Sequence, residues 1–222
     1  MKKIIFLIIL NFLFSDKLPN DVRWTVNSEE YKSTCQQIYK LAIQNLENQT
    51  RPNNHSLNVN DYSNLAIIMD LDETVLDNSQ YQIDIFEINE SYTPGTWAKW
   101  VLREEAKLVP GAKEFIDAVR AQGLQLIFIS NRMDERLQST KNNMKKCNIF
   151  SENDIYLLRL DKADKKHVRR NEIYTATGRM SKHDEFEVVL YIGDAMGDFP
   201  NDDVYEFGKK QFILPNPMYG KW

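Results

Sequence analysis

The fold is decided by the stretch Leu65-Ala-Ile-Ile-Met-Asp-Leu-Asp-Glu-Thr74, in which an unbroken apolar run ends at two aspartates. An apolar run of this length between polar residues is typical of a strand buried on both faces of a parallel sheet. Asp70 and Asp72 follow at the point where the chain leaves that strand. The stretch therefore predicts a central strand that carries two carboxylates at its carboxyl end.

The same kind of apolar run recurs along the chain, and each recurrence predicts a further strand. The four runs are residues 124–129, 155–158, 188–192 and 211–214. Between the first two strands, residues 112–122 have the apolar spacing of a helix that is capped by Gly123. Strands that alternate with helices predict the α/β class, with a doubly wound, mostly parallel sheet.

Residues 28–48 predict an N-terminal helical segment that packs on the core formed by the rest of the chain. Apolar residues recur there at helical spacing and form a single stripe. The stripe consists of Tyr31, Cys35, Ile38, Ala42 and Leu46.

The first fifteen residues have the order of features that a secretory signal requires. Lys2 and Lys3 are followed by an apolar run and then by the small residue Ser15. The run is shorter than the ~20 apolar residues of a membrane-spanning helix. We therefore expect residues 1–15 to be a signal peptide, with an uncleaved membrane anchor as the alternative, and residues 16–222 to form a single domain. The protein is then exported, to the periplasm, the surface or the medium, and no cysteine follows the run to carry a lipid.

The composition excludes several classes of protein. Of the 222 residues, 42% are hydrophobic and 27% are charged, which is typical of globular domains and not of disordered, collagen-like or multi-span membrane chains. The net charge of −4 provides no basic excess for binding duplex nucleic acid. The two cysteines, Cys35 and Cys147, have no metal-ligand spacing. They can form one disulfide in an exported protein, and the sequence leaves this pairing open.

Polar residues that are suited to catalysis or to binding a ligand follow three of the predicted strands. Asp70, Ser130 and Asp194 each stand at a strand end, and the carboxyl ends of parallel strands form the ligand-binding edge of an open α/β sheet. Asp198 follows Asp194 in the stretch Gly-Asp-Ala-Met-Gly-Asp. Clustered carboxylates repel one another unless a cation neutralises them. Because these motifs contain no His or Cys, Mg²⁺ suits them better than Zn²⁺.

Two further groups of residues are suited to binding phosphate, although each also has a plain structural interpretation. The hydroxyl, amide and guanidinium of Ser130, Asn131 and Arg132 can hold phosphate oxygens. The same residues are also ordinary turn formers. The basic cluster in residues 162–170 can supply a lysine to a phosphoryl group, or it can be the solvated face of a helix.

Taken together, these motifs resemble those of the class C acid phosphatases, which belong to the haloacid dehalogenase-like (HAD-like) superfamily. The resemblance covers about residues 24–222. It is strongest in residues 68–81 and 191–199, and it includes residues 93–97, 109–111, 129–132 and 214–222. It implies a HAD-like Rossmannoid fold with a small helical cap inserted at about residues 77–109. One departure is Ala195-Met196-Gly197, which replaces the polar residues of the family pattern, and the other is the missing lipid-attachment motif.

The resemblance implies a hydrolase that forms an aspartyl-phosphate. Asp70 is the expected nucleophile, and Asp72 is the expected general acid and base. Ser130 and a lysine would bind the phosphoryl oxygens. We expect this lysine to be Lys166, with Lys165 second and Lys162 third. The cofactor is expected to be Mg²⁺, and its expected ligands are Asp70, the backbone carbonyl of Asp72, Asp194 and Asp198.

The resemblance also implies residues that bind a phosphate monoester. Thr74 and Asn131 are expected to contact the substrate. Trp97, Tyr62 and Tyr219 are similar to an aromatic clamp that the family uses on nucleobases. A 5′-nucleotidase activity on nucleoside 5′-monophosphates is therefore expected, and broad hydrolysis of monoesters is equally compatible. The alternatives are a phosphotransferase on the same fold and a non-catalytic storage or surface-binding protein. The oligomeric state stays open.

Overall fold

The computed structural model describes residues 18–50, 62–200 and 206–220. Its centre is a five-stranded sheet in the order β5-β4-β1-β6-β7, in which every pair of neighbouring strands is parallel. Each predicted apolar run forms one of these strands, which confirms the α/β, doubly wound architecture. The strands are β1 (Leu65–Met69), β4 (Gln125–Met133), β5 (Ile155–Arg159), β6 (Glu187–Gly193) and β7 (Gln211–Ile213).

The strand order reverses beside the two acidic motifs. From β1 the chain builds outward to β4 and β5, and it then returns to the other side of β1 to add β6 and β7. Ligands of doubly wound sheets bind where the order reverses, at the carboxyl ends of the strands. Here this point lies between β1 and β6. The two strand ends are joined directly, because the Asp70 amide donates to the Ile192 carbonyl at 2.9 Å.

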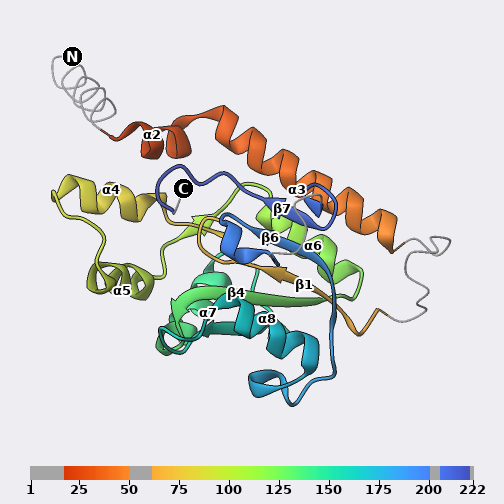
Figure 1. The fold of residues 1–222 in the computed structure, drawn as a ribbon. Coiled ribbons are helices and arrows are strands. Elements are labelled where there is room, and N and C mark those ends of the chain that lie inside the picture. Colours follow the sequence, from red (N-terminus) through yellow and green to blue (C-terminus); the bar gives the residue numbers. More distant parts are fainter. Residues whose placement is uncertain (1–17, 51–61, 201–205, 221–222) are drawn as a thin grey trace, which may run out of the picture.

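Three helices cover one face of the sheet. Figure 1 shows the long helix α3 (Glu29–Gln49) beside α6 (Ala112–Ala121) on this face, and α7 (Leu137–Lys146) contributes Met144 to the same core cluster. The predicted N-terminal helix is thus present, and the Ser28 hydroxyl caps it by accepting the Tyr31 amide at 3.0 Å. One member of the predicted stripe differs: Tyr39 is buried and Ile38 is only partly buried. The helix turns by about 100° per residue, so Tyr39 continues the line that starts at Tyr31 and Cys35.

A second core cluster lies on the opposite face, under α8 (Lys166–Thr175). Ile173 of this helix and Met180 pack against alternate residues of the central strands, such as Ile68 and Ile129. The position of α8 matters for the site, because its first turn reaches the carboxyl end of the sheet. Short 3-10 helices also occur at Asp134–Arg136, Gly178–Met180 and Met196–Asp198.

The segment between β1 and α6 forms two helices that stand beyond the carboxyl ends of the sheet (Figure 1). An antiparallel pair, β2 (Leu76–Asp77) and β3 (Lys107–Leu108), frames it. The helices are α4 (Ser79–Glu87) and α5 (Pro94–Arg103), and the N-terminal helix α2 (Asn20–Asn27) packs beside α4. Pro94 begins α5, and Thr93 and Thr96 cap it reciprocally. The boundaries agree with the expected insertion at residues 77–109, and its role as a cap stays a prediction.

The predictions for residues 1–15 and for the two cysteines have different outcomes. The predicted signal peptide, residues 1–15, lies outside the described residues. Within the described ranges, no helix has the length and apolar character needed to cross a bilayer. Cys35 is buried in α3 and Cys147 lies just after α7, and both are free thiols. The structure thus settles the open pairing in favour of two unpaired cysteines.

Candidate active site

Three carboxylates converge at the reversal point of the sheet. Asp70 ends β1, Asp194 follows β6, and Asp198 closes the short helix that comes after it. One oxygen of each carboxylate lies within 4.8 Å of one from each of the others. The described residues therefore contain the acidic cluster that the sequence placed at this edge.

The loop after β6 is built to bring Asp198 close to the strand end. Gly193 is needed there, because a Cβ atom at this position would lie 2.4 Å from both Cβ and Oδ2 of Asp198. The backbone amides of Asp194 and Ala195 donate to Asp198 Oδ2 at 3.1 and 3.0 Å. These bonds come from the main chain, and the Met196 side chain is 59% exposed. The unusual Ala-Met-Gly sequence therefore leaves the support of Asp198 intact.

The electrostatics of the cluster favour a bound cation. Burial raises the pKa of Asp70 well above its usual range; the charges of Asp198, Asp194 and Asp72 raise it further, against the lowering effect of Lys166. Burial, together with the charge of Asp198, raises the pKa of Asp194 to about 7. Two buried carboxylates and one partly buried carboxylate, without His or Cys, form the donor set of a hard divalent cation. The residues present therefore fit such an ion, whose charge would offset their mutual repulsion.

Lys166, the first residue of α8, also reaches this cluster. Its Nζ atom lies 2.5 Å from Asp70 Oδ1 and 2.5 Å from Asp198 Oδ1. Burial alone would lower the pKa of Lys166, but the two carboxylates raise it above its usual value, so the amine is charged. The alternatives Lys165 and Lys162 are exposed. Of the three lysines considered, the structure brings Lys166 to Asp70.

Asp72 faces a different set of partners. Its Oδ1 accepts hydrogen bonds from Arg132 Nε at 2.9 Å and from Asn78 Nδ2 at 3.0 Å. The carboxylate is not part of the three-carboxylate cluster, so only its backbone carbonyl is left for the expected metal role. The phosphate-binding role predicted for Arg132 is wrong, because this guanidinium is 1% exposed and is committed to Asp72.

Two side chains hold Asp194, and sequence reasoning misassigned one and missed the other. Asn216 Nδ2 donates to Asp194 Oδ2 at 2.8 Å, and Thr74 Oγ1 donates to Asp194 Oδ1 at 3.4 Å. Thr74 is fully buried, so the prediction that it contacts substrate is corrected: it lies behind a carboxylate. The only sequence signal for Asn216 was its place in residues 214–222, which carry part of the family resemblance.

Ser130 and Asn131 lie at the carboxyl end of β4, as predicted. Ser130 is buried; its hydroxyl lies 3.4 Å from Asp72 Oδ2 and accepts the Arg132 amide at 3.1 Å. Asn131 is exposed, and its Oδ1 accepts from Arg169 at 3.1 Å. Ser130 therefore lies on the Asp72 side of the site, whereas Asn131 contacts Arg169 of α8, and its expected contact with substrate stays a prediction.

The structure places two of the three predicted aromatic residues beside the acidic motif. Trp97 of α5 is half-buried, and the Arg132 guanidinium lies 5.8 Å from its ring centre. The Tyr219 hydroxyl donates to Glu73 Oε1 at 2.8 Å while 37% of the residue stays exposed. Burial and the nearby charge of Asp77 raise the pKa of Glu73 to about 8.

Tyr62, the third expected member of the clamp, lies elsewhere. Its hydroxyl donates to the Thr50 carbonyl at 2.6 Å, and the residue precedes β1. It is therefore separated from Asp70 by the whole strand, at ~3.3 Å per residue. Its predicted role in substrate binding is corrected for this reason.

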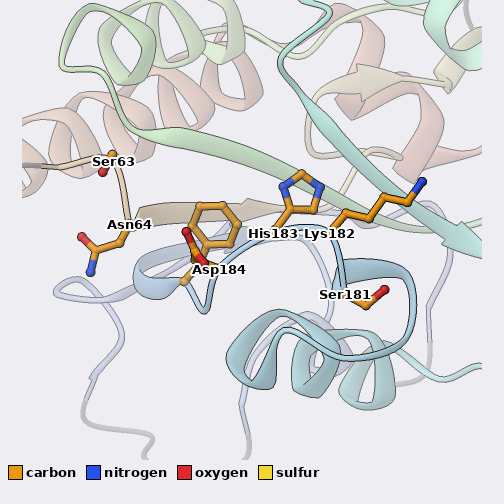
Figure 2. A pocket seen from close by; sticks show the side chains of 7 residues that line it. Ser63, Asn64, Ser181, Lys182, His183 and Asp184 are labelled. Carbon is orange, nitrogen blue, oxygen red and sulfur yellow. The ribbon is translucent and has the colours of Figure 1, made fainter.

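A separate polar pocket of about 440 Å³ opens near the amino ends of β1 and β6 (Figure 2). Its lining consists of Ser63, Asn64, Ser181, Lys182, His183, Asp184 and Phe186. None of the predicted site residues lines this pocket, and it lies at the edge of the sheet opposite the carboxylates. The candidate site is therefore the carboxylate cluster and not this pocket.

Comparison with known proteins places the chain in a family. Residues 11–222 match the family described as HAD superfamily, subfamily IIIB (acid phosphatase). The class C acid phosphatase from Bacillus anthracis is similar in structure, with a TM-score of 0.75 and 28% identity, and the match covers 93% of this chain and 86% of that one. Its tungstate-bound structure matches with a TM-score of 0.74 and 27% identity, over 90% of this chain and 84% of that one.

A plant protein is also similar. The stem 31 kDa glycoprotein of Glycine max is 25% identical over 160 residues, which are 71% of this chain and 60% of that protein. The chain thus spans less than two thirds of the length of this curated relative. The family match nevertheless extends over nearly all of the present sequence, and the resemblance to class C acid phosphatases is confirmed. The chain belongs to the acid phosphatase family of the HAD superfamily, subfamily IIIB.

Proposed function

We propose that this protein is a Mg²⁺-dependent acid phosphatase that hydrolyses phosphate monoesters through a covalent aspartyl-phosphate on Asp70. The observation that carries the proposal is the environment of Asp70. This carboxylate ends the central strand of the sheet, lies within 4.8 Å of two further carboxylates and contacts the Lys166 amine. Membership of an acid phosphatase family supports the same reaction class.

In the first step, an oxygen of Asp70 attacks phosphorus and the bond from phosphorus to the ester oxygen breaks. Asp72 gives its proton to the departing oxygen. In the second step, Asp72 takes a proton from water, the water oxygen attacks phosphorus, and the bond to Asp70 breaks. Inorganic phosphate and the free carboxylate of Asp70 result, so both residues return to their starting state.

The remaining charged groups stabilise the negative charge that gathers at phosphorus. Lys166 fixes the Asp70 carboxylate through Oδ1 and brings a positive charge to the phosphoryl oxygens. Asp70, Asp194, Asp198 and the backbone carbonyl of Asp72 would hold Mg²⁺, which offsets the repulsion between the carboxylates and an anionic substrate.

We infer that the substrate is a monoester with an aromatic leaving part, such as a nucleoside 5′-monophosphate. Trp97 and Tyr219 support this inference. Trp97 of the inserted helix lies near Arg132, the partner of Asp72, and Tyr219 of the C-terminal segment contacts Glu73. Stacking of one base on aromatic side chains contributes ~1–3 kcal/mol. Export through residues 1–15 is proposed as well, on the sequence pattern alone.

The test is phosphate release from a nucleoside 5′-monophosphate and from an aryl phosphate at mildly acidic pH. The purified protein is assayed with Mg²⁺ and with EDTA, beside Asp70→Asn and the matched control Asp117→Asn. Asp117 is an exposed residue of α6 paired only with Lys113 in the described structure. Activity that needs Mg²⁺ and Asp70, and that Asp117→Asn retains, supports the proposal. No release by the folded protein contradicts it, and transfer to an added alcohol in place of water would identify a phosphotransferase.

A further inference from the structure

We propose that Arg132 and Asn78, tied to the inserted helix α5 through Trp100, are positioning residues that make Oδ2 of Asp72 the atom that exchanges the proton with the substrate. The inference rests on the proposed function, because it concerns the acid step of that reaction. It assigns a task to three residues for which sequence reasoning gave either a different role or none.

The two oxygens of Asp72 have different surroundings. Arg132 Nε, Arg132 Nη2 and Asn78 Nδ2 lie 2.9, 2.8 and 3.0 Å from Oδ1. All three nitrogens are donors and accept no hydrogen bond, so a proton on Oδ1 would face hydrogens on every side. Among the described residues, the partner of Oδ2 is the Ser130 hydroxyl at 3.4 Å. A hydroxyl can donate or accept, so the proton of the acid form is compatible only with Oδ2.

The orientation of the Asn78 amide is fixed by Trp100. The indole Nε1 of Trp100 donates to Asn78 Oδ1 at 2.8 Å. An indole nitrogen can only donate, so it requires the amide oxygen on its side and turns Nδ2 towards Asp72. Arg132 Nη2 donates to the same amide oxygen at 3.3 Å. The network therefore has one consistent arrangement of donors and acceptors.

The network of Arg132, Asn78 and Trp100 is buried and spans several elements. Asn78 is 0% exposed, Arg132 1% and Trp100 3%. Arg132 Nη1 donates to Thr140 of α7 at 3.3 Å, which anchors the guanidinium from the side away from Asp72. A charged group held in this way loses little entropy when it aligns its partner, and its hydrogen bonds are stronger than in water.

The connection to α5 also links substrate contact with the acid step. Trp97 lies one turn before Trp100 on the same helix, and Arg132 lies 5.8 Å from its ring centre. A leaving part that stacks on Trp97 therefore lies against the helix that orients Asn78. The insertion thus contributes to the placement of the proton as well as to substrate binding.

The experiment uses the leaving group to isolate the acid step. An alkoxide is a poor leaving group and needs the proton of Asp72, whereas 4-nitrophenolate leaves without one. The values of kcat/KM for glycerol 2-phosphate and 4-nitrophenyl phosphate are measured for the wild type, Arg132→Lys, Trp100→Phe and the benchmark Asp72→Asn. Lysine cannot reproduce the two-nitrogen contact of Arg132, and phenylalanine retains an aromatic ring at position 100 but lacks the indole N–H.

We expect Arg132→Lys to lower kcat/KM for the alkyl ester by about 10-fold more than for the aryl ester, a part of the ~10²–10⁴-fold that general acid catalysis contributes. Trp100→Phe changes the ratio of kcat/KM for the alkyl ester to kcat/KM for the aryl ester in the same direction, by a smaller factor. For both variants the loss falls mainly on kcat. The control Arg120→Lys, whose guanidinium pairs with Asp154 away from the carboxylate cluster, leaves the ratio unchanged.

Equal losses on the two esters in Arg132→Lys and Trp100→Phe would overturn the proposal, because a general loss of structure affects both substrates alike. If Arg132→Lys does not fold, the milder Trp100→Phe decides the question by the same ratio. A wild-type protein that hydrolyses neither ester would instead contradict the proposed function, so the two failures are distinguishable.

Discussion

The Nζ atom of Lys166 lies 2.5 Å from Oδ1 of Asp70, although 96 positions separate the two residues in the sequence. The contact joins the start of α8 to the end of β1, and the same amine also contacts Asp198. One buried cation therefore neutralises part of the charge of two buried carboxylates. Removing it would leave those carboxylates without the positive charge of this amine, which is costly inside a protein.

We predict that Lys166→Met lowers kcat by ~10²–10³-fold, the loss found when one group that stabilises the transition state is removed. Lys165→Met is the matched control, because Lys165 is exposed and adjacent in sequence. The measurement is kcat and KM for an aryl phosphate at saturating Mg²⁺. A large loss in Lys165→Met with little loss in Lys166→Met would show that the wrong lysine has been assigned.

The close approach of Gly193 and Asp198 gives a second prediction. A methyl group on Gly193 would lie 2.4 Å from Asp198, so Gly193→Ala must displace the loop, at a cost of ~1–3 kcal/mol of unfolding free energy by the overpacking scale. Gly197→Ala is the control, because a Cβ there meets nothing within 4 Å. The measurement is the melting temperature of each variant, with and without Mg²⁺. Equal melting temperatures for the two variants would mean that the loop is looser than the structure indicates.

Asn216 leads to a prediction about the metal. Its amide holds Asp194 at 2.8 Å, and residues that orient metal ligands typically account for ~10–100-fold in metal affinity. Asn216→Ala should therefore raise the Mg²⁺ concentration needed for half-maximal activity by such a factor. Mg²⁺ should also raise the melting temperature of the wild type, since a ligand that binds only the folded state stabilises it. A titration that is unchanged in Asn216→Ala would remove Asn216 from the metal site.

The sheet and its carboxylates were predictable from the sequence for a simple reason. Strands buried on both faces are unbroken apolar runs, and the carboxyl ends of parallel strands share an edge. Asp70 and Asp194 could therefore be brought together without knowledge of any loop, whereas the position of Asp198 depends on the loop after β6. The helix that covers the sheet followed from its stripe, with a shift from Ile38 to Tyr39.

The side-chain partners could not be predicted in the same way, because they depend on the direction of each side chain within a turn. Arg132 stands next to residues that face the site, yet its guanidinium turns inward to Asp72. Thr74 belongs to the acidic motif and faces Asp194 from behind. Tyr62 is near Asp70 in sequence but lies at the other end of the strand between them. Sequence proximity was misleading in each of these three cases.

The corrected aromatic set gives the last prediction. If Trp97 stacks on the base of a nucleotide, Trp97→Ala should raise KM for a nucleoside 5′-monophosphate by ~5–150-fold, which corresponds to ~1–3 kcal/mol of stacking. KM for 4-nitrophenyl phosphate should change much less, since its ring is smaller and reaches less of the insertion. Tyr62→Phe should leave both values unchanged, because this residue only donates to the Thr50 carbonyl at the other end of β1. A nucleotide-specific rise of KM in Tyr62→Phe would return Tyr62 to the clamp expected from the family pattern and contradict the placement described here, and an unchanged KM in Trp97→Ala would remove Trp97 from base binding.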